Sequence, residues 1–296
     1  MPLRNPGSSI LLPVILLIIS MTSIQGGASL AKSLFPLVGA PGVTALRLAL
    51  GTLILMLVFK PWRLRFSRRQ CLPLLFYGLA LGAMNYLFYL SIRTVPLGIA
   101  VALEFTGPLA VALFSSRKMI DFVWVILAVS GLWFLLPLDK NVSHVDLSGA
   151  LYALGAGACW AAYILSGQRA GAGHGPATVA VGSLIASLVF VPLGVFQATD
   201  ALWHWSVLPL GLGVALLSTA LPYSLEMVAL TRLPTRTFGT LMSLEPAMAA
   251  ISGFIFLGET LSPIQMAALT AIIIASTGST LTLRQQTKTE RVDTKQ

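Results

Sequence analysis

Long apolar runs separated by short polar clusters occupy most of the chain. A helix needs about 20 mostly apolar residues to cross the hydrocarbon core of a bilayer, and the first run, from Ser9 to about Ala31, has that length. We interpret it as a spanning helix rather than a cleaved signal peptide, because it has a counterpart later in the chain. The pattern predicts about ten membrane-spanning helices, the others at 42–59, 72–92, 97–114, 122–138, 147–166, 176–196, 206–230, 237–257 and 263–283.

Composition supports this interpretation. The 296 residues are 56% hydrophobic and 10% charged, with a mean hydropathy of +0.86. A soluble domain carries about 25% charged residues, because its surface faces water. We therefore expect an all-α polytopic membrane protein embedded in a lipid bilayer.

The net charge of +9 would suggest nucleic-acid binding in a soluble protein, but its distribution indicates topology instead. If the N-terminus is cytoplasmic, the outer segments carry only Lys32, Arg93 and Lys140. An excess of Lys and Arg marks cytoplasmic segments. Both termini are therefore predicted to be cytoplasmic, with no nucleic-acid partner, because the inner segments hold Arg4, Lys60, Arg63, Arg65, Arg68, Arg69, Arg117, Lys118, Arg169, Arg232, Arg236, Arg284, Lys288, Arg291 and Lys295.

One pattern occurs twice. VPLGIAVALEFTGP (Val95–Pro108) and LPTRTFGTLMSLEP (Leu233–Pro246) both contain two prolines twelve residues apart and a glutamate within an apolar run. The duplication predicts two five-helix repeats, 1–138 and 147–283, followed by a cytoplasmic tail, 284–296. Because five is odd, the two repeats would be inverted in the membrane, which places a site near the midplane where they meet.

The glutamates of this pattern, Glu104 and Glu245, are the first candidates for a binding site. A charged side chain at the centre of a membrane helix costs roughly 2.5–3.5 kcal/mol on insertion scales, so it suggests a function. A low-dielectric environment disfavours the charged form of a carboxylate, which suits a group that must gain and lose a proton. The alternative is that each carboxyl group only holds neighbouring helices together by hydrogen bonds.

Pro108 and Pro246 are expected to break their helices beside a substrate cavity at the predicted midplane site. A proline has no N–H, so the carbonyl four residues earlier loses its helical partner. The freed carbonyls would be those of Glu104 and Met242, at matching places in the two repeats and available to a polar substrate. Proline kinks without any binding role are the alternative.

Three further residues complete the predicted substrate and proton site. Arg47 lies inside an apolar span at a depth similar to Glu104, so the two could pair or bracket a zwitterionic ligand; otherwise Arg47 reaches the outer surface. Gln25 and Trp160 occupy equivalent positions in the first helix of each repeat, at an offset of 135 residues. Glu226 is expected to be interfacial, near the cytoplasmic end of its span.

The sequence suggests no metal, cofactor or disulfide. It contains two cysteines and three histidines, without ligand-like spacing, and neither a Walker motif nor a Ser-His-Asp arrangement is visible. Two carboxylates could do acid–base chemistry, so a membrane-embedded enzyme remains an alternative, although we expect no enzyme. A passive channel or scaffold is another alternative.

The repeated pattern, together with FLGETLSP (Phe256–Pro263), resembles the drug/metabolite transporter superfamily of EamA type over nearly the whole chain. Long strings such as TVPLGIAVALEFTGPLAVALFSS and LGAGACWAAYILSGQRAG narrow the resemblance to its amino-acid exporters. The first repeat departs from the pattern, with FSSRKMID (Phe114–Asp121) in place of the F-L-G-E ending.

The resemblance implies a multi-pass protein of the bacterial inner membrane, monomeric or homodimeric, that exports L-threonine, L-homoserine and related amino acids in exchange for protons. We expect alternating access around a site formed by the first to fourth and sixth to ninth helices, with the fifth and tenth outside. A rival within the superfamily is an exporter of cationic or aromatic compounds.

Overall fold

The structure is a computed structural model that describes residues 11–63, 67–114, 119–135, 146–170, 176–232 and 241–293. All of the regular elements in these ranges are helical. Most of the second copy of the repeated pattern, 233–240, lies outside the described residues, as do several of the basic residues used to predict topology.

The first two predicted spans form one continuous element, α1 (Leu11–Phe59), with a sharp kink at Gly39. Gly39 has φ 73° and ψ 161°, a conformation that side chains with a Cβ rarely adopt. Pro41 follows directly and cannot donate a backbone hydrogen bond. The chain therefore turns here with almost no loop, and the two arms of α1 correspond to the predicted spans 9–31 and 42–59.

The other helices follow the predicted spans closely, but three spans are interrupted within the described residues. The predicted span 97–114 is split at Phe105, the span 206–230 contains a π-helical turn, and the span 237–257 is broken at Ser243–Leu244. The remaining elements are η1 (Pro61–Arg63), α2 (Arg68–Ser91), α3 (Leu97–Glu104), α4 (Thr106–Phe114), α5 (Met119–Leu135), α6 (Leu147–Ala170), α7 (Pro176–Gln197), η2 (Asp200–Trp203), α8 (Val207–Ala215), η3 (Leu216–Ala220), α9 (Leu221–Arg232), α11 (Glu245–Leu257) and α12 (Pro263–Asp293).

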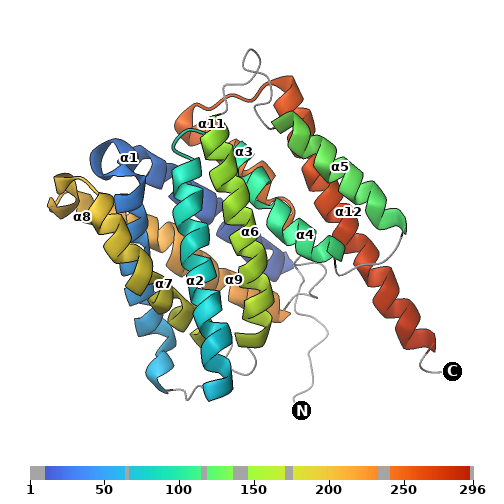
Figure 1. The fold of residues 1–296 in the computed structure, drawn as a ribbon, viewed down its shortest axis with the longest axis horizontal. Helices are drawn as coiled ribbons and strands as arrows, with labels where there is room; N and C mark the ends of the chain where they lie inside the picture. The colour runs from blue at the N-terminus through green and yellow to red at the C-terminus, as the bar shows by residue number, and fades with distance from the viewer. Residues whose placement is uncertain are drawn as a thin grey trace.

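The helices form a bundle around α1, which contacts α2, α7, α8, α9 and α11. α5 and α12 lie side by side at one edge of the bundle, as Figure 1 shows. Small residues allow the closest approaches inside it. A Cβ on Gly107 of α4 would come within 1.9 Å of the carbonyl oxygen of Gly157 on α6, so these two backbones are in direct contact. Such glycine contacts are typical of helix packing in membranes.

Large apolar side chains cover the outside of the bundle, while several polar ones are buried inside. Phe196, for example, is 90% exposed and Ile126 is 69% exposed, whereas Arg47 and Glu104 are each 7% exposed. In the part of the chain that is described, five helices are long and apolar enough to cross a membrane, the first of them spanning both arms of α1. The protein is therefore an all-α membrane protein.

Candidate transport cavity

A cavity of about 420 Å³ lies between α1, α2, α3, α4, α6, α9, α11 and α12. It is lined by six of the seven residues that the sequence singles out: Gln25, Arg47, Glu104, Pro108, Trp160 and Glu245. The seventh, Pro246, is buried at the start of α11 and does not line the cavity. The volume lies within the range of small-molecule sites, about 300–1,000 Å³.

Arg47 is held by the π-helical turn η3. Its Nε donates a hydrogen bond to the Thr219 hydroxyl at 3.2 Å, and its Nη2 donates to the Ser218 carbonyl at 2.9 Å. π-helical turns are rare and occur frequently at functional sites. The guanidinium also lies 5.3 Å from the centre of the Tyr89 ring. Arg47 therefore does not reach to the outer surface, but is fixed with its charge beside the cavity.

Arg47 and Glu104 do not form an ion pair. Among the side chains that the structure describes, the only ion pair within 4.0 Å is Lys32–Glu259. Glu104 is the last residue of α3, and its carbonyl oxygen packs against Gly157 of α6, where a Cβ would come within 2.6 Å. Its side chain still lines the cavity. The two charges thus face one space without neutralising each other directly.

Gln25 of α1 and Glu245 of α11 form a hydrogen bond in the wall of the cavity. The Gln25 amide donates a hydrogen bond to Glu245 Oε1 at 3.4 Å, although the residues are 220 positions apart. They are 1% and 6% exposed, and the other oxygens, Gln25 Oε1 and Glu245 Oε2, have no hydrogen-bond partner among the described groups. Buried polar atoms without a partner are rare. The pair therefore offers two acceptors to a ligand that donates hydrogen bonds, such as an ammonium or a hydroxyl group.

Trp160 forms an aromatic part of the wall. Its ring packs edge-on against Phe105, with 5.5 Å between ring centres and an interplanar angle of 86°. Phe105 lies at the break between α3 and α4. Trp160 of α6 and Gln25 of α1, which the sequence analysis predicts to be equivalent, both line the cavity.

Two expectations from the sequence are wrong. Glu226 is not interfacial: it lines the cavity, and its Oε1 lies 2.9 Å from the Ser20 hydroxyl. The same argument that singled out Glu104, a carboxylate in an apolar span, could have found it. In addition, α12 does not lie wholly outside the site, because Ser276 lines the cavity, where its hydroxyl is 2.9 Å from that of Ser243.

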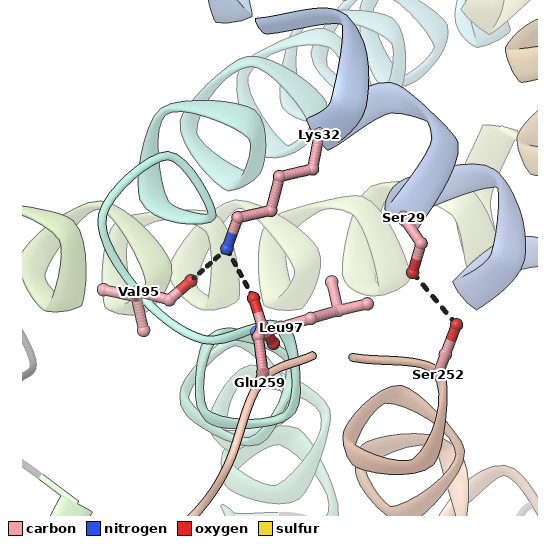
Figure 2. A network of polar contacts seen from close by, with 6 residues as sticks. All are labelled: Ser29, Lys32, Val95, Leu97, Ser252 and Glu259. Carbon is pink, nitrogen blue, oxygen red and sulfur yellow. Dashed lines mark hydrogen bonds and ion pairs between the residues drawn. The ribbon is translucent and has the colours of Figure 1, made fainter. Parts of the chain in front are cut away.

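A second polar cluster joins three elements at the end of the bundle near Lys32, as Figure 2 shows. Lys32 of α1 forms an ion pair of 2.5 Å with Glu259, which follows α11 in the FLGETLSP segment. Lys32 also donates to the Val95 carbonyl at 3.3 Å, and Glu259 accepts the backbone N–H of Leu97 at 2.7 Å. We call Lys32, Val95, Leu97 and Glu259 the end cluster. It ties α1, the start of α3 and the end of α11 together.

A buried cavity with charged walls inside an apolar helical bundle is typical of a membrane transporter. The model of the EamA-like transporter family matches residues 147–281. Relatives that match nearly the full length of the chain carry the name of an exporter. The chain belongs to the EamA-like transporter family, and it is a multi-pass protein of the bacterial inner membrane. Membership of a transporter family sets aside the membrane-enzyme alternative.

The threonine/homoserine exporter RhtA of Escherichia coli (strain K12) is 78% identical, covering 95% of this chain and 96% of its own length. RhtA of Salmonella typhimurium (strain LT2) is 76% identical over 98% of this chain and 100% of its own length. An uncharacterised transporter of Bacillus subtilis, YwfM, is 29% identical over 74% of this chain. A solved crystal structure shares the fold, with a TM-score of 0.61 and 18% identity over 91% of this chain and 98% of the other.

Proposed function

We propose that this protein exports L-threonine, L-homoserine and related amino acids across the bacterial inner membrane in exchange for protons. Identity of 76–78% to exporters named for threonine and homoserine supports the choice of substrate. The observation that carries the proposal is the cavity itself, in which a fixed guanidinium and an incompletely hydrogen-bonded carboxylate face one space.

The charges of the cavity complement those of a zwitterionic amino acid. Arg47 would bind the α-carboxylate, because a guanidinium presents several donors in a plane that matches a carboxylate. Glu245 and Gln25 would bind the ammonium group through their two unpartnered oxygens. Glu104 would add negative charge near the ammonium, and Trp160 would limit the size of the side chain that the cavity accepts.

We further propose ten spanning helices in two inverted five-helix repeats, with both termini cytoplasmic. Supporting this, the helix break at Phe105 and the break at Ser243–Leu244 are offset by 138 residues, as are the two copies of the sequence pattern. The distribution of Lys and Arg supports the orientation. Alternating access would then follow from rocking of the repeats around the cavity.

The substrate is tested by counterflow with purified protein in liposomes. Separate sets of vesicles are loaded with unlabelled threonine, homoserine, lysine or an aromatic cation. Entry of labelled threonine into each set is then followed without any proton gradient. We expect threonine and homoserine inside the vesicles to stimulate entry, and lysine or an aromatic cation to have no effect. Stimulation by the cations alone would contradict the proposal and favour an exporter of cationic or aromatic compounds.

A further inference from the structure

We propose that Glu226 carries the proton that is exchanged for the amino acid, and that the Ser20 hydroxyl changes its hydrogen bond as this proton comes and goes. This inference rests on the proton exchange proposed above and assigns it to particular atoms. It also separates two tasks, because the ammonium group of the substrate is assigned to Glu245 and Gln25.

Ser20 and Glu226 face each other from α1 and α9. The Ser20 hydroxyl oxygen lies 2.9 Å from Glu226 Oε1 and 3.2 Å from the carbonyl oxygen of Pro222, one turn earlier on α9. Ser20 is fully buried, at 0% exposure, whereas Glu226 is partly buried and faces the cavity. The hydroxyl therefore sits between two acceptors of the same helix.

A serine hydroxyl has one proton to donate and two lone pairs with which to accept. When Glu226 is ionised, Ser20 can donate to its carboxylate. When Glu226 is protonated, the carboxyl group can donate to Ser20, and the Ser20 proton can turn to the Pro222 carbonyl. Each protonation state thus keeps a complete hydrogen bond in a place where an unmade bond costs about 1–3 kcal/mol.

The other cavity carboxylates lack such a partner. Glu245 accepts from the Gln25 amide N–H, a contact that suits the ionised carboxylate. For Glu104, no side-chain hydrogen bond is found within the described residues, and none of the cavity carboxylates there has an ion-pair partner within 4.0 Å. Glu226 is therefore the carboxylate for which a single hydroxyl accommodates both the protonated and the ionised form by rotating its proton, whereas Glu245 would need the whole Gln25 amide to turn over.

The charge of the cavity requires that protons bind somewhere within it. Three carboxylates face one guanidinium, and a zwitterion adds no net charge. Since buried charges must be compensated, at least one carboxylate has to be protonated when the cavity is closed. The other titratable or charged groups among the described residues that line the cavity with Glu226 are Arg47 of α1, Glu104 of α3, Tyr163 of α6, Tyr223 of α9 and Glu245 of α11.

The first test is Glu226→Gln, which fixes a neutral side chain of the same shape. Counterflow of threonine needs no proton and should remain within about threefold of wild type at saturating threonine. Accumulation of threonine driven by an acidic vesicle lumen should fall at least tenfold. Asp200→Asn, which neutralises an exposed carboxylate of η2, serves as control and should leave both activities unchanged.

Ser20→Ala tests the hydrogen-bond switch without altering any charge. Removing the donor withdraws a hydrogen bond from ionised Glu226, so the proton would be released only at higher pH. The pH of half-maximal proton-driven accumulation should rise by about one unit. Thr22→Ala is the matched control, because the exposed Thr22 hydroxyl donates only to the Ile18 carbonyl of its own helix. It should not shift the profile.

The outcomes separate this inference from the proposed function. If wild-type protein shows no counterflow of threonine or homoserine, the proposed substrate is wrong. If wild type is active and Glu226→Gln still accumulates threonine against its gradient, Glu226 does not carry the proton. Loss of both activities in a correctly folded Glu226→Gln protein, with no shift of the pH profile in Ser20→Ala, would also overturn the inference.

Discussion

The end cluster and the cavity both place charged side chains inside an apolar bundle, but their charges are compensated differently. In the end cluster, Glu259 has an ammonium on one oxygen and a backbone N–H on the other, and Lys32 has both a carboxylate and a carbonyl. In the cavity, Glu104, Glu226 and Glu245 have no ion-pair partner within 4.0 Å among the described side chains.

This difference indicates different roles. A compensated ion pair stabilises one arrangement of the helices, since separating the helices leaves each charge without its partner. Carboxylates without a cationic partner can instead be compensated by something that arrives and leaves, either a proton or the ammonium group of a substrate. We therefore infer that the end cluster holds one end of the bundle closed while the cavity binds the transported species.

The largest expected effect is that of Arg47→Ala. Without Arg47, three carboxylates would share the cavity without any guanidinium, and the Ser218 carbonyl would lose its donor. Arg47→Ala removes two hydrogen bonds made by a charged group, and each such bond contributes about 1.5–3 kcal/mol. Threonine counterflow should fall by about 100-fold or more, and Arg47→Lys should restore little of it because a lysine lacks the planar donor group.

Size-exclusion chromatography of the purified variants would show whether they remain folded. If folded Arg47→Ala protein shows counterflow at the wild-type rate, Arg47 does not bind the substrate and its role is purely structural.

A smaller effect is expected for Glu245→Gln. The amide keeps the shape but removes the charge that would bind the substrate ammonium group. A hydrogen bond to a charged group contributes about 1.5–3 kcal/mol, so the KM for threonine counterflow should rise roughly 10- to 100-fold. An unchanged KM, measured beside the Asp200→Asn control, would place the ammonium group elsewhere.

The smallest effect is expected at the end cluster. Lys32 and Glu259 are 21% and 15% exposed, and partly exposed ion pairs contribute about 1 kcal/mol or less. Lys32→Met should open this end of the bundle more often, raising its accessibility by about two- to fivefold. A cysteine at Ser29, whose hydroxyl lies 3.0 Å from that of Ser252, would report this as faster maleimide labelling.

The labelling would be done with Cys71 and Cys159, both free thiols, replaced by serine. Unchanged labelling in Lys32→Met, together with unchanged transport, would show that the end cluster does not control access to the cavity.

The sequence predicted the helices well because apolar runs of membrane length are a strong signal. It also assigned residues far apart in the chain, such as Gln25 and Glu245, to one site, because inverted repeats place a site where the two halves meet. The π-helical turn that holds Arg47 could not be predicted, since nothing in Leu216–Ala220 distinguishes it from ordinary helix. Glu226 was misplaced because its position near the end of its span suggested an interfacial place, whereas helices distant in sequence surround it, with the Ser20 hydroxyl of α1 at 2.9 Å.

The end cluster was missed for a similar reason. Lys32 was interpreted only as one of the few basic residues on the outer side, and Glu259 only as part of a family pattern. Their contact depends on the turn at Gly258, where φ is 65°, directly before Glu259. Contacts between three separate segments at the end of a bundle produce no periodic pattern of residues, so a single sequence does not predict them.

The most direct test of the account measures proton movement and threonine movement together. Liposomes containing the protein and a trapped pH dye, with the membrane potential clamped by potassium and valinomycin, are given external threonine. The account predicts that the lumen becomes more alkaline as threonine enters, because each entering amino acid is exchanged for outgoing protons. Threonine entry with an unchanged or more acidic lumen would contradict it.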